Sequence, residues 1–259
     1  NKFMDVRWMA KLFRTPASDV ASQIKINFSM VLNLLLSHSP EQVKDLLGRS
    51  FASYLIGKTA KKKSGKDRRR DLWGDFLQHL DFLEETGYVT ESAELTEKGR
   101  WTSQLRVDQP LLIAEGFELG ILPQSEPSFL AAIIAAFVNE RESDTKIHKK
   151  RVPRPLLDAF YGVVKGLRPF AWQMQDRGFE ARPFHLRPVV AIYAWANGGQ
   201  WEKVQALADM EEGDLVMLIL RTADNLRHIR ALRQVFPDAA DTADRAIEMI
   251  VREPVVFDL

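Results

Sequence analysis

Hydrogen-bonding side chains recur at helical spacing in EEGDLVMLILRTADNLRHIRAL, residues 211–232. Asp224, Asn225 and His228 follow Arg221 by three, four and seven residues, which places all four on one flank of a predicted helix. Such a flank can offer guanidinium, amide and imidazole donors to a ligand. It can equally be an ordinary solvated face on which Arg221 pairs with Asp224, and such a pair adds little stability. The residues alone leave both interpretations open.

This helix lies in a segment, residues 107–259, whose pattern is helical throughout. Its stretch PSFLAAIIAAFVNE begins with Pro127, a residue favoured in the first helical turn, and stays apolar on every side up to Asn139. We therefore expect a central helix that others surround and whose polar end leaves the core. Residues 197–199, Asn-Gly-Gly, predict a helix end, and a further helix begins near Trp201. The predicted core positions of the 211–232 helix are Leu215, Leu218, Ile219, Leu226 and Ile229.

The preceding segment, residues 71–106, predicts a winged helix. LWGDFLQHLDFLEETGYV has one apolar helix face and ends at Gly87, the residue type expected just after a helix. A short strand, a polar turn and Leu95 follow, and Thr96 can cap the next helix. The predicted fold class is therefore mainly α, with a winged-helix domain followed by a multi-helix bundle. The apolar face of the first helix consists of Leu72, Phe76, Leu77, Leu80 and Leu83.

The first 56 residues are expected to supply only a short helical hairpin. An apolar run from Phe28 to Leu36 precedes Ser39, which is placed to cap, and Pro40, which suits the first position of the next helix. A hairpin of this size has no core of its own, so it should lean on the rest of the chain or on a neighbour. The apolar positions of its second helix are Val43, Leu46, Leu47 and Phe51.

Positive charge is concentrated in a linker between these parts. The formal net charge of the chain is +1, but GKTAKKKSGKDRRR, residues 57–70, carries +7 and the rest of the chain carries −6. Glycine and serine are interspersed and no large apolar residue is present, so this stretch is not expected to pack. It is either a solvated hinge or a non-specific contact for phosphate groups.

The chain lacks the residue sets that common catalytic chemistry needs. It has no cysteine, and its five histidines form no HExxH or other close pair, so no metal site is expected. No GxxxxGK[ST] and no DExH-type motif occurs, so nothing here can bind a triphosphate and Mg²⁺ together. There is no uncharged apolar run of about 18 residues and no signal-peptide pattern, which makes a cytoplasmic protein without membrane contact the default expectation.

The chain contains INFSMVLNLL, GRSFASYL, ELTEKGRWTSQL, VDQPLLIAEGFELGIL, AIYAWANGGQW and EEGDLVMLILRTADNL, in that order. These segments, which span most of residues 22–259, resemble the C-terminal region of the Ski2-like superfamily 2 RNA helicases. That family contains the Mtr4-, Ski2- and HelY-type proteins, and its last part is called DSHCT. By this resemblance the first two segments follow the second RecA-like motor domain, the third is the winged helix, and the others belong to the helical bundle.

The resemblance implies a role for two of the predicted helices of the bundle, the central apolar helix and the helix at residues 211–232. In the family the winged helix braces the motor domains, and the bundle closes a channel for single-stranded RNA. AAIIAAFVNE would be a ratchet-like strip against the bases with Glu140 facing nucleic acid, and Arg221 would reach the same channel, stacking on a base or forking to phosphate. Met217 and Leu220 stand where the family usually has basic residues. The candidate nucleic-acid contacts are Glu140, Arg221, Asn225, His228, Lys61, Lys62, Lys63, Arg68, Arg69 and Arg70.

The resemblance and the missing motifs together imply the C-terminal part of an ATP-dependent RNA helicase. The eukaryotic exosome-type members insert a long arch where this chain has only the short basic linker, so a role that depends on the arch is not expected. The expected partners are single-stranded RNA, or DNA, and the RecA-like motor domains of the same parent chain. The parent would be the NTP hydrolase with ATP and Mg²⁺ as cofactors, whereas this part would have no cofactor and no activity alone.

The alternative is a stand-alone winged-helix DNA-binding or adaptor protein that uses the bundle as a partner module. Such a regulator needs a recognition helix whose side chains read base edges. The candidate is the segment Glu97–Arg106, which offers Lys98, Arg100, Gln104 and Arg106.

Overall fold

The computed structural model describes residues 24–51, 53, 72–138 and 152–256. Eleven helices form the regular structure of these residues, which confirms the mainly α fold class. None of these helices is long and apolar enough to cross a membrane. The predicted contact Glu140 and the linker residues Lys61, Lys62, Lys63, Arg68, Arg69 and Arg70 lie outside the described residues.

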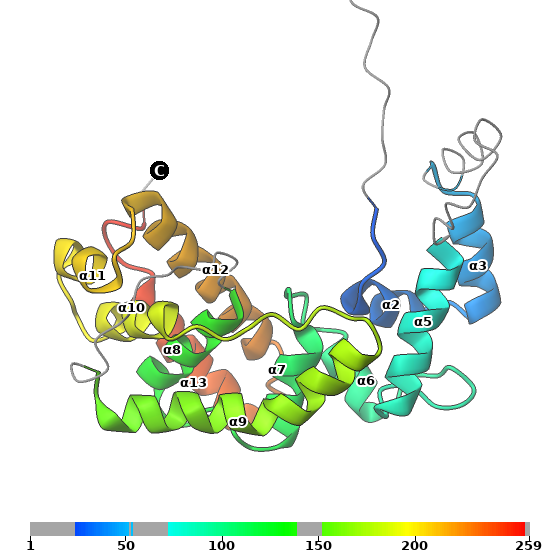
Figure 1. The fold of residues 1–259 in the computed structure, drawn as a ribbon, viewed down its shortest axis with the longest axis horizontal. Coiled ribbons are helices and arrows are strands. Elements are labelled where there is room, and N and C mark those ends of the chain that lie inside the picture. The colour runs from blue at the N-terminus through cyan, green and yellow to red at the C-terminus, as the bar shows by residue number, and fades with distance from the viewer. Residues whose placement is uncertain (1–23, 52, 54–71, 139–151, 257–259) are drawn as a thin grey trace, which may run out of the picture.

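The expected central helix is α8, Pro127–Val138. Every residue from Leu130 to Val138 is at most 3% exposed, because other helices pack on several sides of α8. The apolar pattern without a polar face therefore predicted this helix correctly. Its main neighbours are α10 (Leu186–Ala196), α12 (Glu212–Arg230) and α13 (Pro237–Ile250), and α11 (Trp201–Ala208) packs against α10 (Figure 1).

Three further predictions for the helices of the bundle are also confirmed. Helix α10 ends at Ala196, and Gly198 has φ of +80°, a left-handed conformation that glycine adopts without a steric cost. Helix α11 begins at Trp201, as expected. All five predicted core positions of α12 are at most 6% exposed: Leu215, Leu218, Ile219, Leu226 and Ile229.

The predicted hairpin is formed by α2, Phe28–Leu35, and α3, Pro40–Gly48. Ser39 caps α3 in a reciprocal arrangement with Gln42, and Pro40 occupies the first turn. Only part of the expected apolar face is covered, because Val43 and Leu47 are buried whereas Leu46 and Phe51 are 46% and 50% exposed. The hairpin packs against the rest of the chain, because both of its helices contact α5 (Leu72–Glu85).

The winged-helix pattern is reduced in the structure. Helix α5 buries four of its five predicted apolar residues, and Leu77 is 37% exposed. The expected two-stranded wing is one isolated bridge between Val89 and Leu95 in the part of the chain that is described. Thr96 caps α6 by accepting from the backbone N–H of Gly99, but α6 covers only Glu97–Thr102 and is shorter than the predicted recognition helix.

Two further helices, α7 (Pro110–Glu118) and α9 (Arg154–Asp176), connect the two ends of the molecule (Figure 1). Helix α9 packs on α7 and α8 along one part of its length. Arg177, just after the C-terminal end of α9, pairs with Glu85 of α5. Within α9, the ring centroid of Phe170 lies 5.8 Å from that of Phe82 in α5. The bundle and the N-terminal helices are thus held together by a long helix as well as by chain connectivity.

A buried polar group ties the wing to α7. The Tyr88 side chain is fully buried, and its hydroxyl donates to Oε1 of Glu115 at 2.8 Å. The ammonium of Lys98 lies 2.5 Å from the same oxygen and 4.2 Å from the centroid of the tyrosine ring. Burial raises the pKa of Tyr88 well above its ordinary value, and the negative charge of Glu115 raises it further. The phenol therefore stays protonated and keeps donating.

We expect Tyr88→Phe to lower the free energy of unfolding by about 1.5–3 kcal/mol at pH 7, because a carboxylate loses a buried donor. A raised folded-state pKa means that the phenol stabilises the fold below its unfolded pKa, about 10, and that this contribution is lost as the pH rises above it. Urea unfolding at pH 7 and pH 11 measures this. The difference in stability between wild type and Tyr88→Phe should shrink at pH 11; a difference that grows would contradict the assignment.

Candidate nucleic-acid interface

Arg221 lies on the exposed flank of α12, and its side chain is 34% exposed. Met217 and Leu220 on the same flank are 55% and 38% exposed. His228 is half-buried, but Asn225 is only 8% exposed. Helices α8, α10 and α13 all pack on α12 and cover residues beyond its apolar stripe. Asn225 is therefore buried, whereas the sequence placed it on an exposed flank. Its contact to nucleic acid stays a prediction.

Arg221 forms an ion pair with Asp108, a residue that precedes α7 and is far away in the sequence. The sequence suggested a local pair with Asp224, whose carboxylate lies 3.8 Å from Arg227. Asp108 and Arg221 are both partly exposed, so their pair contributes little to stability. Its structural effect is to hold the guanidinium at the surface beside the start of α7.

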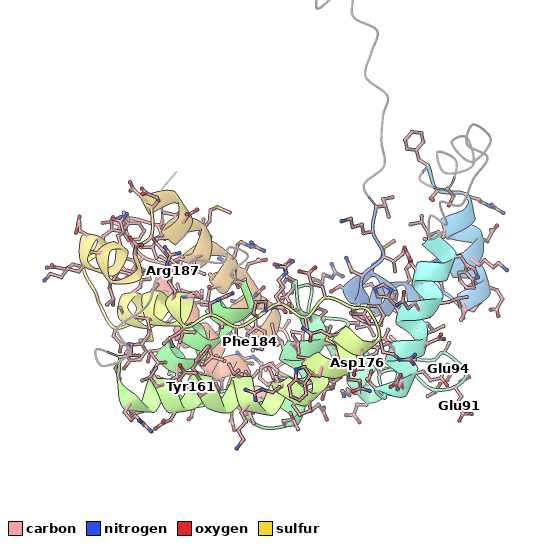
Figure 2. All side chains as sticks on the ribbon, viewed as in Figure 1. Glu91, Glu94, Tyr161, Asp176, Phe184 and Arg187 are labelled. Atoms are coloured by element: carbon pink, nitrogen blue, oxygen red, sulfur yellow. The ribbon has the colours of Figure 1, made fainter. Side chains whose placement is uncertain are left out.

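Gln109, which follows Asp108 in the chain, is 8% exposed and connects three segments by hydrogen bonds. Its amide nitrogen donates to the carbonyl of Phe137 near the end of α8, and its amide oxygen accepts from the backbone N–H of Arg182, both at 3.2 Å. The ring of Phe184, on the segment that crosses between α9 and α10, packs edge-on against Phe137 with centroids 5.0 Å apart (Figure 2). Residues 108 and 109 therefore hold the flank of α12 and the C-terminal end of α8 at one junction.

This junction brings together α12, which carries Arg221, and the C-terminal end of α8. Glu140 follows the end of α8 by two positions, although it lies outside the described residues. The sequence did not single out Asp108 or Gln109, because each is one polar residue among many and its contacts are made only in the folded chain. The one local signal was their position just before Pro110, where a helix begins.

The side chains on this flank are of kinds that can bind nucleic acid. A guanidinium can fork to phosphate or stack on a base, and exposed Met217 and Leu220 can contact the apolar faces of bases. Across the described parts of the chain, no group of three histidine, cysteine, aspartate or glutamate side chains could hold a metal ion.

The winged-helix segment has a different character. The turn of the wing carries exposed Glu91 and Glu94 (Figure 2), so a phosphate backbone would meet negative charge there. Lys98 of α6 is occupied by Glu115, and Trp101 is 4% exposed. Helix α6 thus uses half of its residues to pack against its own chain.

The fold and the junction define a helical bundle in which a central apolar helix and an arginine-bearing helix meet. Residues 92–258 match the DSHCT (NUC185) domain, so the chain belongs to this family, which is found in DExH-box RNA helicases. A segment of 64 residues is 34% identical to the DExH-box ATP-dependent RNA helicase DExH15, chloroplastic, of Arabidopsis thaliana. That similarity covers 25% of this chain and 6% of the relative.

Proposed function

We propose that this chain is the C-terminal nucleic-acid-guiding region of an ATP-dependent RNA helicase of the Ski2-like group. It holds single-stranded RNA beside RecA-like motor domains of the same parent chain. The observation that carries the proposal is the junction of Asp108 and Gln109, which holds Arg221 and the end of α8 together in a DSHCT domain.

In this proposal the work is divided between two parts of the parent. The motor domains bind ATP and Mg²⁺ and supply the hydrolysis, and this region keeps hold of the strand between hydrolysis cycles. Residues 71–106 brace the motor domains, and the linker at 57–70 adds non-specific attraction for phosphate. A cytoplasmic location and a preference for RNA over DNA are parts of the same proposal.

The stand-alone DNA-binding alternative is less consistent with the geometry. A recognition helix needs side chains that are free to reach base edges. Helix α6 is only six residues long, and Lys98 is held by Glu115. The acidic turn of the wing also opposes a phosphate contact. No observation favours this second function over the first.

The test is Arg221→Ala in the 259-residue chain. We expect single-stranded RNA binding to weaken by about 1–3 kcal/mol, roughly 5- to 150-fold, because a stacking or charge-assisted contact is lost. The melting temperature should hardly change, since a partly exposed ion pair contributes little. Fluorescence anisotropy with a labelled oligo(U) strand and thermal unfolding measure the two quantities.

Arg221→Lys is the matched control. It keeps the charge but not the planar fork, so it should recover only part of the affinity that alanine loses. Unchanged RNA affinity in Arg221→Ala, or unfolding of the bundle, would assign the arginine to a solvated face or a structural ion pair and would overturn the proposed function.

A further inference from the structure

A groove adjoins the junction. It has a volume of about 620 Å³ and lies between the start of α2, the middle of α5, residues 106–110 and the segment after α9. Asp108 lines this groove and also pairs with Arg221, so one residue links the groove to the flank of α12 described above. Of the residues that line it, the sequence pattern singled out only Arg106, as part of the candidate recognition helix of the DNA-binding alternative.

The charges in the groove leave a positive excess. Both acidic side chains that line it, Asp108 and Glu180, have an arginine partner. Lys25 and Arg106, which reach the groove from different segments, are exposed and have no ion-pair partner among the residues that the structure describes. Two separate cations on an open groove favour a ligand with more than one negative charge.

Aromatic side chains form one wall of the groove. The rings of Phe28, His79 and Phe179 pack together, with centroids 4.7–4.8 Å apart, and Phe179 is partly exposed. Basic side chains that follow a groove with aromatic rings beside them are typical of sites for single-stranded nucleic acid. A purely acidic peptide would use the cations but would gain nothing from the rings.

We propose that this groove is a second site for the RNA strand, in which Lys25 and Arg106 bind backbone phosphates and the exposed edge of Phe179 contacts a base. The proposal rests on the proposed function, because it extends the strand from Arg221 past Asp108 toward α2. It predicts that RNA binding depends on the N-terminal helices as well as on the bundle.

The experiment compares Lys25→Ala/Arg106→Ala with wild type in the 259-residue chain, using a labelled oligo(U) strand of 20 nucleotides and a salt series. Losing two phosphate contacts should reduce the slope of log K against log salt by about 1.4. The same relation makes the loss of affinity about sevenfold larger at 50 mM salt than at 200 mM salt. Both residues are exposed, so the melting temperature should stay the same.

Lys165→Ala/Arg168→Ala is the matched control. It removes one lysine and one arginine from the exposed surface of α9, away from the groove. A loss in the groove variant and not in this control supports the second site. Equal losses in both would show diffuse attraction and overturn it. If Arg221→Ala weakens binding but the groove variant does not, the groove proposal fails and the proposed function stands. If neither variant changes binding, both proposals fail.

Discussion

Leu226→Ala should lower the free energy of unfolding by about 2–5 kcal/mol, because it leaves a cavity where α12 meets the bundle. The Leu226 side chain is fully buried, and it lies on the stripe opposite to Arg221. Loss of this packing should expose the apolar helix α8, which depends on its neighbours for burial. Urea or thermal unfolding measures the change directly.

Met217→Ala supplies the control on the same helix. Met217 is 55% exposed, so removing its side chain should change stability by no more than about 0.5 kcal/mol. If RNA contacts the flank, Met217→Ala should instead act on binding. A result in which Leu226→Ala were as mild as Met217→Ala would mean that α12 packs differently from the structure, and the placement of Arg221 would then lose its basis.

The bundle could be predicted from the sequence because its helices follow local rules. An apolar stretch with no polar face must be surrounded, and α8 is; a stripe at helical spacing must be buried, and the stripe of α12 is. Proline and glycine positions also marked helix starts and ends at Pro40, Pro127 and Gly198, because their backbone preferences act locally.

The candidate site was only half predictable for the same reason. Arg221 could be placed on a flank of α12 by counting residues. Its partner Asp108 could not, because the pair joins residues more than a hundred positions apart and needs the folded positions of α7 and α12. The burial of Asn225 was missed because periodicity shows where a helix is apolar and does not show how many neighbours pack on it.

The wing illustrates a limit of pattern matching. Helix, turn and helix were found in the predicted order, but the expected strands reduce to the bridge between Val89 and Leu95. The length of a strand depends on how many residues of a neighbouring segment can pair with it. Here Leu95 is followed at once by Thr96, the cap of α6, so few residues remain for pairing. The pattern therefore predicted the order of the elements. It did not predict how few residues pair in the wing, or that α6 packs against its own chain.

Gly99→Ala should be strongly destabilising, by about 3 kcal/mol or more, and it tests whether α6 is a packing helix. A methyl group at this position would overlap with the backbone carbonyl of Tyr88. That carbonyl also accepts from the backbone N–H and from the hydroxyl of Thr96, each at 3.1 Å, so it cannot move without straining both of these bonds. Unfolding by urea gives the magnitude.

Gly162→Ala is the matched control, because Gly162 lies in α9 and an added methyl group would meet nothing within 4 Å. There alanine should stabilise the chain by roughly 0.5–1 kcal/mol through its higher helix propensity. Opposite signs at Gly99 and Gly162 would show that α6 is pressed against its own chain. If Gly99→Ala were tolerated as well as Gly162→Ala, α6 would stand away from Tyr88. Its side chains would then be open to a nucleic-acid ligand, and the DNA-binding alternative would regain support.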